Sequence, residues 1–170
     1  MKRFFFLLGT GLVSMLVGCS TTPVALAPVG PDPGGIGTTA STGGLQVFSR
    51  VVERSDDQNQ GGNGLSDWRR YTGYDIYDLQ GKRVRHVRNA IGYYAESPER
   101  VTLPPGSYLV KAQAKGSIWV NVPVTIERGR TTRVHLDNNW NPMADAPNRE
   151  IVTMPNGQPV GWRAESANGN

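Results

Sequence analysis

Alternation of apolar and polar residues is the clearest pattern in the chain. It is strictest over residues 117–127, where the apolar positions are Ile118, Val120, Val122, Val124 and Ile126. Alternation places these side chains on one face of a strand, so we expect that face to be buried and the opposite face, which carries Trp119, to be wet or to bind a ligand. No segment of ten or more residues has a convincing helical period. The pattern therefore predicts an all-β protein.

Six further segments are rich in β-branched and aromatic residues and are bounded by Gly, Pro, Asn or Asp. They are residues 46–53, 71–78, 82–88, 100–103, 107–114 and 131–137. The pairs Lys115-Gly116 and Arg128-Gly129 predict the turns that join the last three strands into a meander. We therefore expect a single antiparallel β-sandwich of about seven strands over residues 45–137.

Both ends of the chain differ in amino-acid composition from this central region. Residues 20–44 are rich in Pro, Gly, Ser and Thr and contain one charge, Asp32, so residues 19–44 are predicted to be a disordered tether. Residues 138–170 are predicted to be a tail that packs on the sandwich and holds a small hairpin around Asn156-Gly157.

The first eighteen residues combine a basic start, a short apolar run and small residues before the only cysteine. The last four positions of this segment, Leu16, Val17, Gly18 and Cys19, resemble the lipobox of bacterial lipoprotein signals. The resemblance implies cleavage before Cys19, a lipid on its sulfur and an acylated new amino terminus. It predicts an outer-membrane lipoprotein that faces the periplasm, with the cell surface as the alternative location. The competing interpretation of the segment itself is an ordinary secretory signal or a core helix.

Two motifs in the central region resemble those of carboxypeptidase-regulatory-like, transthyretin-like and Cna-B-type β-sandwiches. One is the turn Asp-x-x-Gly-x-x-Val, which runs from Asp78 to Val84. The other is the strand entry Leu-Pro-Pro-Gly-Ser-Tyr, which runs from Leu103 to Tyr108. The resemblance implies two packed antiparallel sheets, a prealbumin-like fold, and no catalytic residues.

Charge and cysteine content exclude several classes of function. Lys2 and Arg3 leave with the predicted signal, so the 18 basic residues fall to 16 against 14 acidic ones, a net charge of +2. This balance does not favour nucleic acid as the partner. Because Cys19 is the sole cysteine, the chain can form no internal disulfide. We predict no metal site and no cofactor.

Catalysis finds little support in the sequence. The two histidines, His86 and His135, each fall inside a predicted strand, and no nucleophile elbow is present. We therefore predict that the protein is not an enzyme. The alternative is a small cell-wall hydrolase that would use the carboxylates Asp75, Asp78, Glu96 and Glu99, although Asp78 is better explained as the first residue of a turn.

Two groups of residues are candidates for binding, and each has a structural alternative. The basic residues Lys82, Arg83, Arg85 and Arg88 predict a contact surface for an anionic partner, or else an edge strand protected from aggregation. The aromatic residues Tyr93, Tyr94 and Trp119 predict a platform for sugar or peptide, unless the tail covers Trp119 with Trp140 and Trp162. The expected partners are the membrane, through the lipid anchor, and a cell-wall polysaccharide or an envelope protein.

Overall fold

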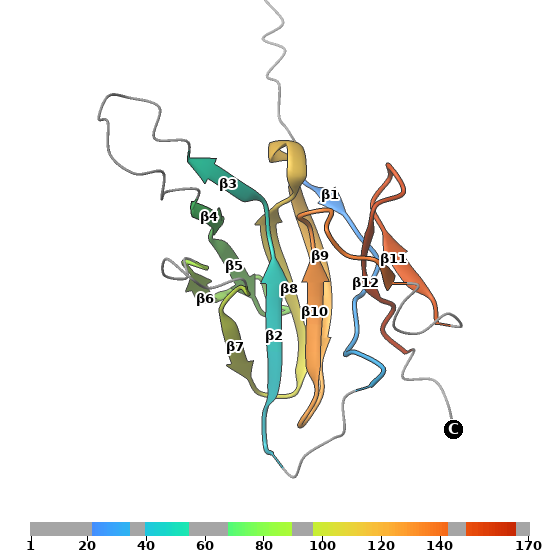
Figure 1. The fold of residues 1–170 in the computed structure, drawn as a ribbon. Coiled ribbons are helices and arrows are strands. Elements are labelled where there is room, and N and C mark those ends of the chain that lie inside the picture. Colours follow the sequence, from blue (N-terminus) through green and yellow to red (C-terminus); the bar gives the residue numbers. More distant parts are fainter. Residues whose placement is uncertain (1–21, 35–39, 55–67, 90–96, 143–148, 166–170) are drawn as a thin grey trace, which may run out of the picture.

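The computed structural model describes residues 22–34, 40–54, 68–89, 97–142 and 149–165 (Figure 1). These residues form twelve strands and one short 3-10 helix, η1 (Lys115–Ser117), and they contain no α-helix. The predicted all-β fold is therefore confirmed. Within the same ranges there is no helix long and apolar enough to cross a membrane.

Two main sheets make the body of the sandwich. The five-stranded sheet has the order β1 (Val24–Ala25), β9 (Trp119–Ile126), β8 (Gly106–Gln113), β5 (Tyr74–Tyr77) and β6 (Arg83–Val87). The three-stranded sheet has the order β10 (Thr131–His135), β2 (Gly43–Phe48) and β7 (Arg100–Leu103), and it lies across the first sheet (Figure 1). Two hairpins complete the fold: β3 (Val51–Arg54) with β4 (Trp68–Tyr71), and β11 (Ile151–Thr153) with β12 (Pro159–Trp162).

The core lies between the sheets and follows from the alternation in the sequence. In β9 the residues Val120, Val122, Val124 and Ile126 are buried, as predicted. Ile118 is exposed, because β9 begins only after it and Ile118 belongs to the turn that leaves η1. The opposite sheet contributes buried side chains at every second position of β2, β7 and β10. They are Leu45, Val47, Val101, Leu103, Thr132 and Val134.

The predicted tether is wrong for residues 24–32, which belong to the folded domain, and for Gly43 and Gly44, which begin β2. Strand β1 pairs in parallel with β9, and Val29 is fully buried. The Val29 N–H donates to the carbonyl of Pro123 at 2.9 Å, and the Thr125 N–H donates to the Val29 carbonyl at 2.8 Å. This segment thus covers the edge of β9 that would otherwise be open, despite a composition typical of a linker.

The predicted three-strand meander is correct for β8 and β9 but wrong for the third strand. The turn at Arg128-Gly129 sends the chain into the other sheet, where β10 pairs in parallel with β2. Alternation of Thr132, Val134 and Leu136 fits a half-buried strand in either sheet, so the pattern alone does not distinguish the two pairings.

The tail forms the predicted hairpin and packs on the sandwich. Strands β11 and β12 pair around a turn in which Gly157 has a φ of 84°. Gly161 allows the hairpin to approach the body closely, because a Cβ atom there would lie 2.5 Å from Val29 Cγ1. The N-terminal segment is therefore held between β9 on one side and the hairpin on the other.

Candidate functional site

The predicted basic surface lies on β6 and on the residues that directly flank it, at one edge of the five-stranded sheet. We call Lys82, Arg83, Arg85 and Arg88 the basic rim. All four are exposed, which fits both the binding interpretation and that of a protected edge strand.

Neighbouring acidic residues neutralise part of the basic rim. Arg83 lies 3.6 Å from Asp75, which also hydrogen-bonds His86 Nδ1 at 2.9 Å. Arg85 donates to Glu99 at 3.3 Å. No ion pair joins Lys82 or Arg88 to another described residue, so the rim keeps an excess of positive charge.

Trp119 is accessible, with 39 % of its surface exposed. The interpretation in which Trp140 and Trp162 cover it is wrong. Trp140 stacks on His135 of β10, and Trp162 contacts Trp140 edge-on. The Lys111 ammonium lies 5.8 Å from the Trp119 ring centre and belongs to the adjacent strand β8. Tyr93, Tyr94 and Cys19 lie outside the described residues, so the predicted platform is seen only at Trp119.

The carboxylates of the hydrolase alternative have structural partners in the described part of the chain. Asp78 Oδ1 accepts the N–H groups of Gln80 and Lys82 at 3.0 and 2.8 Å, which confirms its role at the start of a turn. Asp75 and Glu99 pair with side chains of β6. Glu96 lies outside the described residues.

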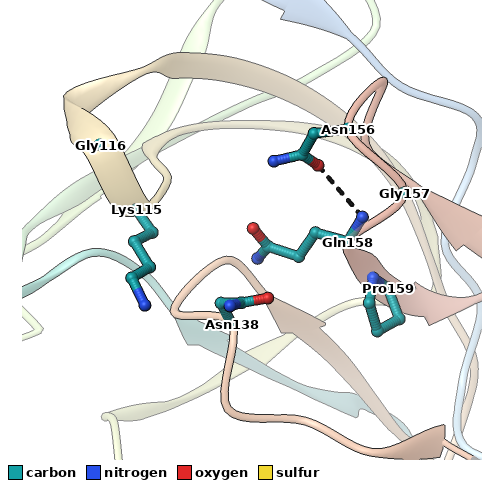
Figure 2. Close-up of a pocket in the computed structure, with 7 residues that line it drawn as sticks. All are labelled: Lys115, Gly116, Asn138, Asn156, Gly157, Gln158 and Pro159. Carbon is teal, nitrogen blue, oxygen red and sulfur yellow. Dashed lines mark hydrogen bonds between the residues drawn. The ribbon is translucent and has the colours of Figure 1, made fainter.

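Three loops meet in a polar cavity of about 490 Å³, which we call the end-loop pocket (Figure 2). The η1 turn supplies Lys115 and Gly116, the loop after β10 supplies Asn138, and the β11–β12 turn supplies the rest. That last group is Asn156, Gly157, Gln158 and Pro159. The volume of the end-loop pocket falls in the range of about 300–1,000 Å³ that is typical of small-molecule sites.

Backbone hydrogen bonds fix the loops of the end-loop pocket. The Lys115 N–H donates to the carbonyl of Leu136 at 2.8 Å, which ties η1 to the loop after β10. In the hairpin turn, the Gln158 N–H donates to Asn156 Oδ1 at 3.1 Å, and the Gln158 carbonyl accepts the Met154 N–H at 2.8 Å. The pocket is therefore built by backbone contacts before any ligand binds.

Gln158 is the most unusual residue of the end-loop pocket. Only 8 % of its surface is exposed, and its Nε2 donor has no hydrogen-bond partner among the described residues. Figure 2 shows its amide directed into the space between Lys115 and Asn138. An unpaired buried donor costs roughly 1–3 kcal/mol. Five side chains in the described part of the chain have such an unpaired buried atom, and Gln158 is the one of them that lines this pocket.

A second feature, the aromatic stack, lies on the three-stranded sheet. His135 lies between Phe48, at 4.4 Å and 14° between the rings, and Trp140, at 4.6 Å and 12°. Trp162 meets Trp140 edge-on at 5.3 Å, and Tyr71 meets Phe48 edge-on at 5.8 Å. Burial, with a smaller contribution from the Arg133 charge, lowers the pKa of His135 to about 4, so this imidazole is neutral at pH 7.

The aromatic stack borders a second polar cavity, of about 430 Å³. Its lining includes His135, Trp140, Trp162 and the ion pair between Arg133 and Asp32. The stack joins the tail to β2 and β10, because Trp140 of the tail stacks on His135 of β10, which in turn stacks on Phe48 of β2. We therefore regard it as a feature that attaches the tail.

Sequence reasoning missed both the end-loop pocket and the aromatic stack. It did predict the turns at Lys115-Gly116 and Asn156-Gly157, but nothing in the sequence shows that two turns 41 residues apart face each other. The available signal was a set of amide and basic residues at turn positions.

Comparisons with known proteins bring no relative to this chain: no family model, no curated protein and no solved structure matches it. The likeness to carboxypeptidase-regulatory-like, transthyretin-like and Cna-B-type sandwiches therefore stays a resemblance of motifs.

Proposed function

We propose that this protein is a lipid-anchored cell-envelope protein that displays a non-enzymatic β-sandwich as a binding module. The observation that carries the binding role is the end-loop pocket, in which three loops of a rigid sandwich place polar side chains around one cavity. Loops at the end of a β-sandwich are a common place for recognition, because the sheets hold them while their sequence is free to vary. The lipobox at Leu16 to Cys19 supports the location.

The basic rim is the second contact surface of this proposal. An envelope polymer is large enough to touch a pocket and a charged edge at once, and the rim's excess of positive charge favours a polymer that carries anionic groups. We prefer binding to hydrolysis because Asp75, Asp78 and Glu99 are each engaged in a turn or an ion pair.

Replacement of Cys19 with alanine tests the membrane anchor. The variant is expected to lose membrane attachment or to keep its uncleaved signal, because the sulfur that would carry the lipid is gone. Fractionation of cells and intact-mass measurement check this result. Cys19→Ser also removes the thiol while it keeps nearly the same size, so it is expected to behave as Cys19→Ala does. Unchanged mass and fractionation in both variants would contradict the anchor.

Simultaneous replacement of Arg83, Arg85 and Arg88 with serine tests the basic rim. Retention on purified envelope polymer is expected to fall by about tenfold or more at low salt, and by less at high salt, where the charges are already screened. The control replaces Arg128, Arg149 and Arg163 with serine, which removes equal charge away from β6. Equal losses in the two triple variants would show that only net charge matters and would reject the rim as a specific surface.

A further inference from the structure

We propose that the end-loop pocket recognises a carboxylate, carried either by an acidic sugar or by the free end of a peptide. This inference rests on the proposed binding function and deepens it by naming the chemical group that is bound. It is carried by the side chains of Lys115, Asn156 and Gln158, which present hydrogen-bond donors to one cavity.

The donors can be identified from the bonds already made. Asn156 Oδ1 already accepts the Gln158 N–H at 3.1 Å, whereas the two N–H donors of its NH₂ group make no hydrogen bond to another described residue and are fully available to a ligand. Gln158 Nε2 is buried and unpartnered, and Lys115 carries three N–H donors on an exposed side chain. A ligand that satisfies all three must be rich in acceptors.

Charge selects a carboxylate over a neutral acceptor. Lys115 is the one charged side chain among the described residues that line the pocket, and no acidic side chain lines it with them. Asp137 lies next to the lining residue Asn138, but it is buried, and its Oδ1 accepts the Asn139 N–H at 3.4 Å. Burial raises the pKa of Asp137 while the nearby Lys115 charge lowers it, so this carboxylate, when ionised, offsets part of the lysine charge from behind the pocket lining. Lys115 is still the one charged group that lines the pocket itself. Hydrogen bonds from charged or amide donors to a carboxylate are stronger than those to a neutral oxygen.

Preorganisation adds to this preference. The Gln158 backbone is fixed on both sides by the hairpin turn, and the side chain is already mostly buried. Binding therefore orders few groups, while it supplies a partner to a donor that has none in the free protein. Asn138 has a φ of 66°, which asparagine tolerates better than most residues, and its side chain lies opposite Gln158 (Figure 2).

The test is calorimetric titration of the full-length protein with two pairs of matched probes. One pair is glucuronate and glucose, and the other is N-acetyl-alanyl-alanine and its carboxamide. We expect at least one carboxylate to bind about tenfold or more tightly than its neutral partner. The pair that shows the difference identifies the source of the carboxylate.

Two variants locate the binding. Lys115→Gln removes the charge from an exposed side chain and keeps a similar length, and Gln158→Met removes the unpaired donor and keeps the volume. Each is expected to weaken carboxylate binding by about tenfold, whereas Lys82→Gln, which makes the same change on the basic rim, should leave it unchanged. If Gln158→Met does not fold, Lys115→Gln still decides the question.

The inference is overturned if the neutral partners bind as tightly as the carboxylates, if no probe binds, or if Lys115→Gln and Lys82→Gln behave alike. In each of these cases, retention of the wild-type protein on envelope polymer shows that the proposed function stands without carboxylate recognition. Loss of retention as well would show that the proposed function itself fails.

Discussion

A chain shortened to begin at Ala40 is expected to unfold with a free energy about 3 kcal/mol or more below that of a chain beginning at Thr22. The shorter chain lacks β1 and Val29, whose complete burial alone contributes roughly 1.5–3 kcal/mol. It also loses the hydrogen bonds that Val29 makes to β9 and that Gly30 makes to Trp162. The conformational entropy that residues 22–34 lose when they become ordered offsets part of this stabilisation.

Urea unfolding of the two shortened chains measures the difference. The chain beginning at Thr22 keeps every contact described here and serves as the reference. Val29→Ala in the longer chain should lower the free energy of unfolding by about 2 kcal/mol, through a cavity between β9 and the hairpin. Equal stability of the chains that begin at Thr22 and Ala40 would mean that residues 22–34 are a tether after all.

Much of the fold could be predicted because alternation encodes which face of a strand is buried. The pattern located β8 and β9, the turns that follow them and the hairpin around Gly157. The same pattern wrongly placed the segment from Val24 to Asp32 in the tether. A strand that pairs through only two residues needs little apolar alternation, and the prolines of this segment are typical of a linker.

The partner of a strand is harder to predict than its existence. β10 has the same alternation whether it follows β9 in one sheet or crosses to β2 in the other. The crossing is stabilised by contacts distant in sequence, such as the hydrogen bond from the Leu136 N–H to the carbonyl of Phe48 at 2.7 Å. The end-loop pocket was missed for the same reason, since it depends on where β10 and the tail end relative to η1.

The aromatic stack predicts that stability falls in mild acid. The pKa of His135 is lowered from 6.5 to about 4, chiefly by burial, so between these values the unfolded chain binds a proton that the folded chain excludes. The free energy of unfolding should therefore be at its full value above pH 6.5 and should decrease as the pH falls toward 4. The difference between the pKa values of the unfolded and folded chains corresponds to a loss of about 3 kcal/mol from this group.

His135→Phe isolates this contribution, because phenylalanine can keep a flat ring between Phe48 and Trp140 but takes up no proton. Burial raises the pKa of Asp137, which acts in the opposite direction, but this residue is present in both proteins and its effect cancels in the comparison. Urea unfolding at several pH values between 4 and 7.5 should show the steeper loss in the wild type. Parallel curves would mean that the folded protein protonates His135 without penalty. The Trp140 and Phe48 faces would then stabilise the imidazolium as strongly as burial disfavours it.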